Sequence, residues 1–238
     1  MAASWGLVLV IGLLLLTPGS GRAADLLAQG LAALKAGQHQ EGAELLKRYL
    51  ARHPGNVKAR LARAEALKAL GRRKEALQEL EEGLVRHPGN VALLQAKGRL
   101  LVESGKFSQA VAVYTRALAL APENAQVFKD RAEAYTQDGR LKEALKDMNR
   151  AVALAPKDPW AHFQRGMVKF ALEDYQQAVA DLTAAIRLNP EGALFYFARG
   201  QIYYRHLNQP EKGLADFRKG CRLGHSLSCR ELEMLRPK

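Results

Sequence analysis

AQVFKDRAEAYTQDGRLKEALKDMNRAVALAPKD, residues 125–158, is the stretch that decides the fold of this chain. It contains one of five prolines that recur every 34 residues, at Pro54, Pro88, Pro122, Pro156 and Pro190. Glycines and alanines keep the same spacing, at Gly37, Gly71, Gly105, Gly139, Ala76, Ala110, Ala144 and Ala178. Because three residue types share one period, the sequence predicts a tandem array of repeats.

The quoted stretch predicts two amphipathic helices joined by a turn. Apolar residues recur at helical spacing on both sides of a polar tract, at Phe128, Ala132, Tyr135, Leu141, Leu145, Met148 and Val152. Gly139 is expected to end the first helix in a left-handed conformation, and Pro156 is expected to stop the second. Small residues stand where the two helices must approach closely, at Ala132, Ala144 and Ala151.

This unit resembles the tetratricopeptide repeat, which has the same length, a small residue in the first helix, paired alanines in the second and a terminal proline. One slot departs from the pattern, because Arg131 stands where the repeat has a leucine. The resemblance implies an all-α, right-handed solenoid of about six helix-turn-helix repeats with a C-terminal capping helix. It also implies a binding scaffold, since proteins of the family share the fold but have many unrelated partners.

The period sets the boundaries of the solenoid, which is expected over residues 24–238. Its repeats are predicted at 23–56, 57–90, 91–124, 125–158, 159–192 and 193–225, with a capping helix at about 226–235. The first repeat has Gly42 and Tyr49 in its small-residue slots. Such departures are common in terminal repeats, which lack a neighbour on one face. The sixth repeat carries one extra residue in its turn, before Pro210.

Residues 1–23 are interpreted as a secretory signal peptide. The apolar run from Trp5 to Leu16 is too short to span a bilayer, which takes about 20 residues, and Pro18 and a tract of small residues follow it. We expect cleavage after Ala23 and export to the bacterial periplasm or out of the cell; a eukaryotic secretory lumen is the alternative. No Lys or Arg precedes the run, so an uncleaved N-terminal anchor is the second interpretation.

The net charge of +12 would suit an acidic partner. However, the basic residues are spread along the chain, and their densest group is Arg72-Arg73-Lys74. Export would also separate the protein from most nucleic acid. We therefore expect a solvated basic surface and no nucleic-acid binding.

One basic residue recurs at the period of the repeats, at Arg63, Lys97, Arg131, Arg165 and Arg199. Each arginine has an acid sixteen residues later, or seventeen past the insertion, in the second helix of its repeat. This match predicts structural ion pairs with bidentate geometry, namely Arg63–Glu79, Arg131–Asp147, Arg165–Asp181 and Arg199–Asp216. At this offset Lys97 faces Val113 and has no acid. The alternative is a basic stripe that follows a polyanion.

No motif in the sequence carries a catalytic mechanism. The six histidines are scattered, and none stands at a dependable metal-ligand spacing from Cys, Asp or Glu. The sequence also has no nucleophile elbow and no phosphate-binding loop. We expect no enzyme activity, no metal and no cofactor.

The two cysteines, Cys221 and Cys229, are expected on either side of a turn at Gly224. An oxidising compartment would join them in a disulfide, which would stabilise the folded end by about 2.5 kcal/mol through loop closure. The stretch from Phe217 to Leu232 is also similar to Sel1-like cysteine-rich helical repeats, whose cysteines bracket a turn at this spacing.

The resemblance further implies that the first helix of each repeat lines an inner groove. On that stripe of the fifth and sixth repeats stand Trp160, Phe163, Met167, Phe170, Phe197, Gln201 and Tyr204. We interpret these residues as a site for an apolar peptide or amphipathic helix, with Lys129 and Arg205 selecting acidic flanks. The alternative is that the bulky residues only pack between neighbouring first helices.

The sequence therefore predicts an exported, non-catalytic scaffold that binds a protein or peptide segment in its groove, without a stable membrane span. A structural protein that self-assembles into homo-oligomers is the first alternative. An envelope module that binds a glycan or lipid is the second.

The signal-peptide interpretation predicts the N-terminus of the mature protein. N-terminal sequencing of the secreted or periplasmic protein should begin at Ala24 or within a few residues of it. An intact Met1 on cytosolic protein would contradict both export and the disulfide.

Overall fold

The computed structural model of the protein describes residues 20–235, which form thirteen α-helices and no strand. The all-α fold that the resemblance to the tetratricopeptide repeat implies is therefore confirmed. The apolar run Trp5–Leu16 and most of the predicted signal peptide lie outside the described residues. Among the described helices, none combines the length and the apolar character needed to cross a membrane.

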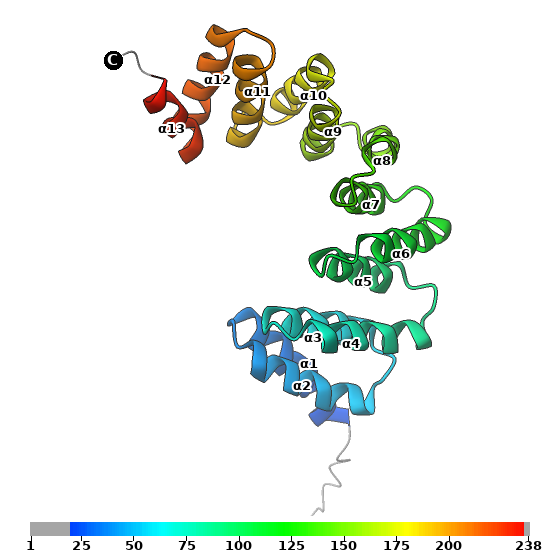
Figure 1. Cartoon of the computed structure of the whole chain (residues 1–238). Helices are drawn as coiled ribbons and strands as arrows, with labels where there is room; N and C mark the ends of the chain where they lie inside the picture. Colours follow the sequence, from blue (N-terminus) through cyan, green and yellow to red (C-terminus); the bar gives the residue numbers. More distant parts are fainter. Residues whose placement is uncertain (1–19, 236–238) are drawn as a thin grey trace, which may run out of the picture. The chain divides into compact units, whose positions relative to one another are not determined.

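The chain separates into two compact units, residues 1–72 and 73–238, and the division falls between the two helices of the predicted second repeat. In the first unit, α1, α2 and α3 pack against one another (Figure 1). Their bounds are Ser20–Lys35, His39–Arg52 and Val57–Ala69.

The second unit begins with α4 and continues with four helical hairpins and the cap α13 (Figure 1). Each hairpin packs against the next one along the chain. The bounds are α4 Arg73–Arg86, α5 Val91–Glu103, α6 Phe107–Leu120, α7 Ala125–Gln137, α8 Leu141–Leu154, α9 Pro159–Ala171, α10 Tyr175–Leu188, α11 Ala193–Arg205, α12 Pro210–Arg222 and α13 Ser226–Met234.

Periodic residues set where the helices begin and end. The second helix of each of the first five repeats ends two residues before a proline of the 34-residue series, as α8 does at Leu154 before Pro156. After the first four of these prolines, the side chain two residues later caps the next helix, because its oxygen accepts from a backbone N–H group of the first turn. The caps are Asn56, Asn90, Asn124 and Asp158.

The turn inside each repeat needs a backbone conformation that favours glycine. Gly139 has a φ of 75°, and Gly37, Gly71 and Gly105 have similar values, which confirms the expected left-handed turn. Glu173 stands 34 residues after Gly139 and adopts the same conformation, with a φ of 63°. A side chain with a Cβ is strained there.

Small residues allow the close contact of the two helices in each hairpin. Ala110, Ala144 and Ala178 are fully buried, as the alanine series predicts. In the first repeat the slot holds Gly42, where an added Cβ would lie 2.3 Å from Cδ2 of Leu34. Leu34 occupies the space that an alanine needs, which explains this departure from the pattern.

The strained turn predicts a stabilising substitution. Glu173→Gly should raise the free energy of unfolding by about 1 kcal/mol, because glycine adopts a positive φ without steric cost. The matched control, Gly139→Glu, should lower it by a similar amount. Urea unfolding of both variants tests this, and a less stable Glu173→Gly protein would contradict it.

Candidate functional site

Three arginines of the periodic series donate paired hydrogen bonds to buried aspartates. Arg131 Nε and Nη2 lie 2.7 and 2.8 Å from the two carboxylate oxygens of Asp147. Arg165 and Arg199 contact Asp181 and Asp216 in the same way. The hydrogen bonds that Arg131 donates to Asp147 raise the pKa of Arg131, against the opposite effect of burial. The predicted partners thus meet with the fork geometry that only arginine provides.

Each of these arginines also contacts the preceding repeat, which the sequence analysis did not anticipate. The third nitrogen, Nη1, donates to a polar side chain sixteen residues earlier: Arg131 to Thr115 at 3.0 Å, Arg165 to Asn149 at 3.3 Å and Arg199 to Thr183 at 2.9 Å. These acceptors lie on the second helix of the preceding repeat. Their own 34-residue spacing was the signal that could have revealed them.

Lys97 and Arg63, the other two members of the periodic basic series, differ from these three arginines in their contacts. Lys97 has an acidic partner after all, because its Nζ lies 2.8 Å from Glu81 Oε1, sixteen residues earlier in the preceding repeat. The position sixteen residues after Lys97 holds Val113, so the acidic partner comes from the preceding repeat instead of from its own. Arg63 and Glu79 belong to the two separately described units, so their pairing stays a prediction.

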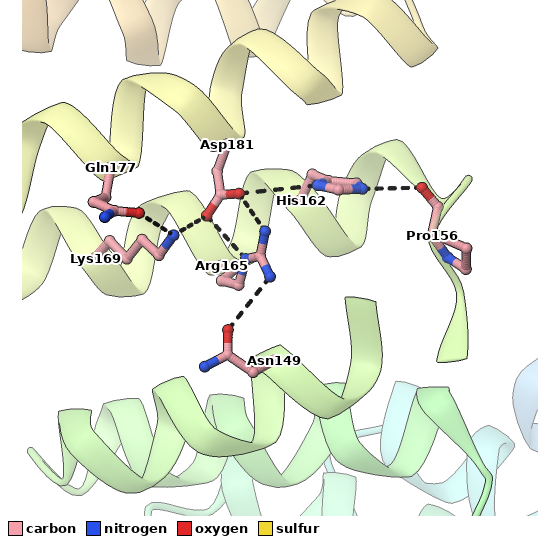
Figure 2. A network of polar contacts seen from close by, with 7 residues as sticks. All are labelled: Asn149, Pro156, His162, Arg165, Lys169, Gln177 and Asp181. Atoms are coloured by element: carbon pink, nitrogen blue, oxygen red, sulfur yellow. Dashed lines mark hydrogen bonds and ion pairs between the residues drawn. The ribbon is translucent and has the colours of Figure 1, made fainter. Parts of the chain in front are cut away.

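A larger polar network surrounds Asp181, as Figure 2 shows. Besides Arg165, Lys169 Nζ lies 2.9 Å from Asp181 Oδ2, and His162 Nδ1 lies 3.9 Å from Oδ1. His162 Nε2 contacts the carbonyl oxygen of Pro156 at 3.0 Å. The polar residues of α9 are therefore directed at one buried carboxylate, and they join α9 to α10 and to the end of α8.

The opposite side of α9 borders a hollow of about 380 Å³ toward α7. Its apolar lining includes Phe163, Met167 and Phe170 of α9 and Met148 of α8, and its polar lining includes Lys129 and Glu133 of α7. We call this space the first hollow. Its volume lies within the usual range of ligand pockets.

A second hollow of about 270 Å³ lies between α9 and α11. It shares Phe163, Met167 and Phe170 with the first hollow, and α11 contributes Phe197 and Gln201 among others. Five of the seven predicted groove residues therefore line two neighbouring hollows. The shared α9 residues are partly buried, so they retain surface that a ligand can cover.

The other two predicted groove residues lie elsewhere. Trp160 is 49% exposed and packs its ring edge-on against Phe163 and Phe195, beside the hollows. Tyr204 does not line either hollow; it packs toward α12, where its ring lies 6.3 Å from that of Phe217 and its Cβ fills the space beside Gly213. Tyr204 therefore contacts α12 rather than either hollow, and its role in the groove stays a prediction.

Both basic residues expected to select acidic flanks are occupied within the protein. Lys129 Nζ lies 2.7 Å from Asp158 Oδ2. Burial alone would raise the pKa of Asp158, but the hydrogen bond and charge of Lys129, together with hydrogen bonds from the backbone N–H groups of Trp160 and Ala161, lower it. Arg205 Nη2 contacts both carboxylate oxygens of Glu231 at 2.9 and 3.0 Å, and Gln201 donates to the same group. Both cations therefore already have an acidic partner within the protein, although the side chain of Arg205 is still 53% exposed.

Outside the hollows, Cys221 and Cys229 are joined as a disulfide at the α12–α13 turn, with their Cα atoms 4.7 Å apart. That the protein carries this bond in the cell stays a prediction. Within residues 20–235, no three His, Cys, Asp or Glu side chains are grouped so that they could hold a metal ion.

Family models match most of the repeat region. Three models described as tetratricopeptide repeats match residues 33–100, 96–159 and 134–202. Together they cover residues 33 to 202 without a gap. A comparison with curated protein sequences finds no match.

Several solved structures share the fold at low sequence identity. PilF of Pseudomonas aeruginosa is 18% identical, with a TM-score of 0.71 over 90% of this chain and 97% of that one. MamA of Desulfovibrio magneticus RS-1 is 22% identical, with a TM-score of 0.64 over 71% and 95%. YrrB, described as a repeat protein with an unusual peptide-binding site, is 20% identical, with a TM-score of 0.62 over 81% and 100%.

The arginine contacts predict energetic coupling within a repeat. Arg131→Ala and Asp147→Ala should each destabilise the protein, because each leaves a largely buried charge without its partner. The double variant should cost less than the sum by about 0.5–3 kcal/mol. Urea unfolding of the four proteins measures this coupling.

The exposed pair Arg140–Glu143, joined at 3.0 Å along one turn of the chain, is the matched control. Its cycle should show no measurable coupling, since solvent screens surface pairs. Strict additivity at Arg131 and Asp147 would contradict the structural role and return the series to the polyanion interpretation.

Proposed function

The chain belongs to the tetratricopeptide-repeat family, and we propose that it is a non-catalytic scaffold that binds a peptide segment of another protein across the two hollows. The family is generally one of protein-interaction repeats rather than enzymes, and YrrB is described as having a peptide-binding site. We place peptide binding in this chain on the surface that α7, α9 and α11 form.

The observation that carries the proposal is the pair of adjoining hollows with shared apolar walls. Both hollows are lined by Phe163, Met167 and Phe170. An extended or helical segment that fills one hollow therefore lies directly beside the other. Burying a Phe or Met side chain contributes about 1.5–3 kcal/mol. A ligand that covers several of these groups gains enough to offset its own ordering. Met167 is a flexible side chain that adapts to differently shaped apolar ligands.

The proposal includes export, supported by the apolar run Trp5–Leu16 and by the short-range cysteine pair. The periplasm or the extracellular space is the proposed location. Self-assembly is the principal alternative, in which a second copy of this chain would occupy the hollows.

A peptide selection combined with two methionine-to-glutamine variants tests the proposal. The protein is screened against a phage library of random peptides, and selected peptides are synthesised and measured by fluorescence anisotropy. Met167→Gln should abolish or greatly weaken binding, because it places an amide in the shared apolar wall. The melting temperature should change little, since Met167 is only partly buried.

Met234→Gln is the matched control, because Met234 is 62% exposed on α13 and lines neither hollow. It should bind peptides like the unmodified protein. Failure to select any peptide, or equal binding by both variants, would contradict the proposal. A concentration-dependent oligomer in light scattering that Met167→Gln dissociates would instead support self-assembly.

A further inference from the structure

The rim of the first hollow carries a carboxylate that the protein does not neutralise. Glu133 on α7 is exposed and lines this hollow beside Lys129. The charge of Lys129 is already matched by Asp158. In the described part of the chain no Lys or Arg forms an ion pair with Glu133, whose recorded electrostatic neighbours are the acids Asp130 and Glu103.

Asp130 adds a second negative charge, about one turn before Glu133 on the same helix. Its side chain is buried, and its two oxygens accept hydrogen bonds from Gln126 at 2.6 Å and Gln95 at 3.3 Å. Neutral amides satisfy the oxygens but leave the charge in place. Asp147, Asp181 and Asp216, equally buried, each face an arginine. Asp130 is therefore the exception among the buried aspartates.

The effect of these charges extends to the surrounding groups. Burial, followed by the charges of Asp130 and Glu103, raises the pKa of Glu133. Burial, and then the charge of Asp130, also raises the pKa of Tyr114, although Arg99 opposes this. Arg99 is exposed on α5 and makes no hydrogen bond or ion pair with Glu133 or Asp130 in the described structure. A negative region thus adjoins the apolar wall of Met167 and Phe170.

We propose that the occupant of the first hollow is a basic amphipathic peptide, whose apolar side chains contact Met167 and Phe170 while a Lys or Arg side chain pairs with Glu133. This inference rests on the proposed function and specifies its partner. It replaces the expectation of acidic flanks, since the cations that were to select them are paired internally. The net charge of +12 opposes a basic ligand at long range, but salt screens charges more than about 10 Å apart, so the contact with Glu133 governs the choice locally.

The first test compares the peptides that different proteins select. The unmodified protein and Glu133→Lys are screened in parallel against the random-peptide phage library. Peptides selected by the unmodified protein should contain Lys or Arg next to apolar residues, and Glu133→Lys should lose this preference. Glu211→Lys makes the same change of charge at an exposed residue of α12 that lines neither hollow, and it should retain the preference.

The second test measures synthetic peptides by anisotropy. For a selected basic peptide, Glu133→Gln should weaken binding about two- to fivefold, and Glu133→Lys should weaken it about tenfold. Replacing the basic residue of the peptide by Glu should weaken binding to the unmodified protein and restore it to Glu133→Lys. This exchange distinguishes a direct pair from a general loss of structure.

Two further readouts separate ligand pairing from a structural role. Binding of the basic peptide should weaken as the pH falls through the raised pKa of Glu133, because protonation removes the attracting charge; Glu133→Gln should lack this dependence. The melting temperature of Glu133→Gln should not fall, since the folded state disfavours the charged form of this group.

The outcomes distinguish this inference from the function on which it rests. Selected peptides that depend on Met167 but are neutral or acidic, or that bind Glu133→Lys unchanged, would overturn the basic partner and leave the peptide scaffold standing. Absence of any Met167-dependent peptide would overturn both.

Discussion

The three-way contact of Arg131, Arg165 and Arg199 is the interaction on which the arrangement of the second unit depends. Each guanidinium occupies two nitrogens with a buried aspartate of its own repeat and the third with a polar residue of the repeat before it. One side chain therefore sets the distance between the two helices of a hairpin and the register of that hairpin against its neighbour. A lysine cannot do both, because a point charge lacks the planar fork. Lys97 contacts Glu81 of the preceding repeat, and the later position in its own repeat holds Val113 instead of an acid.

Because of these contacts, the first helix of a repeat has a polar side that packs against the second helix and another side that borders the hollows. On α9, Arg165, Lys169 and His162 turn toward Asp181, while Phe163 and Met167 turn toward the hollows. The polar side holds the helix in position, so the apolar side can stay partly uncovered without the hairpin collapsing onto it. The same division on α7 places Arg131 against Asp147 and leaves Glu133 at the rim of the first hollow.

Charge is distributed so that the binding surface differs from the protein as a whole. The chain is strongly basic, yet the basic residues nearest the hollows are matched by Asp158 and Glu231. On α7, Glu133 and Asp130 form no ion pair with a Lys or Arg of the described part of the chain. The three solved structures compared above share the fold at 18–22% identity.

The sequence by itself determined the repeats, the helix boundaries and the arginine–aspartate pairs. All of these depend on contacts within one hairpin, where an offset of sixteen residues, or seventeen past the insertion in the sixth repeat, joins the same two positions. The starts and ends of helices depend on residues in the adjacent backbone, such as Asn124, Gly139 and Pro156. These local effects can therefore be predicted without the tertiary structure. At Glu173 such a local prediction fails, because the turn keeps its left-handed conformation although glycine is absent.

Only the tertiary structure decided which charges are available to a ligand. Lys129 is paired with Asp158 at the start of the next repeat, Arg205 with Glu231 of the cap, and Tyr204 turns toward α12. Each outcome depends on which side chain of a neighbouring element comes nearest, and helical spacing alone does not specify that choice. The period predicts which residues share a face; competition among partners across packed helices decides which of them remain for binding.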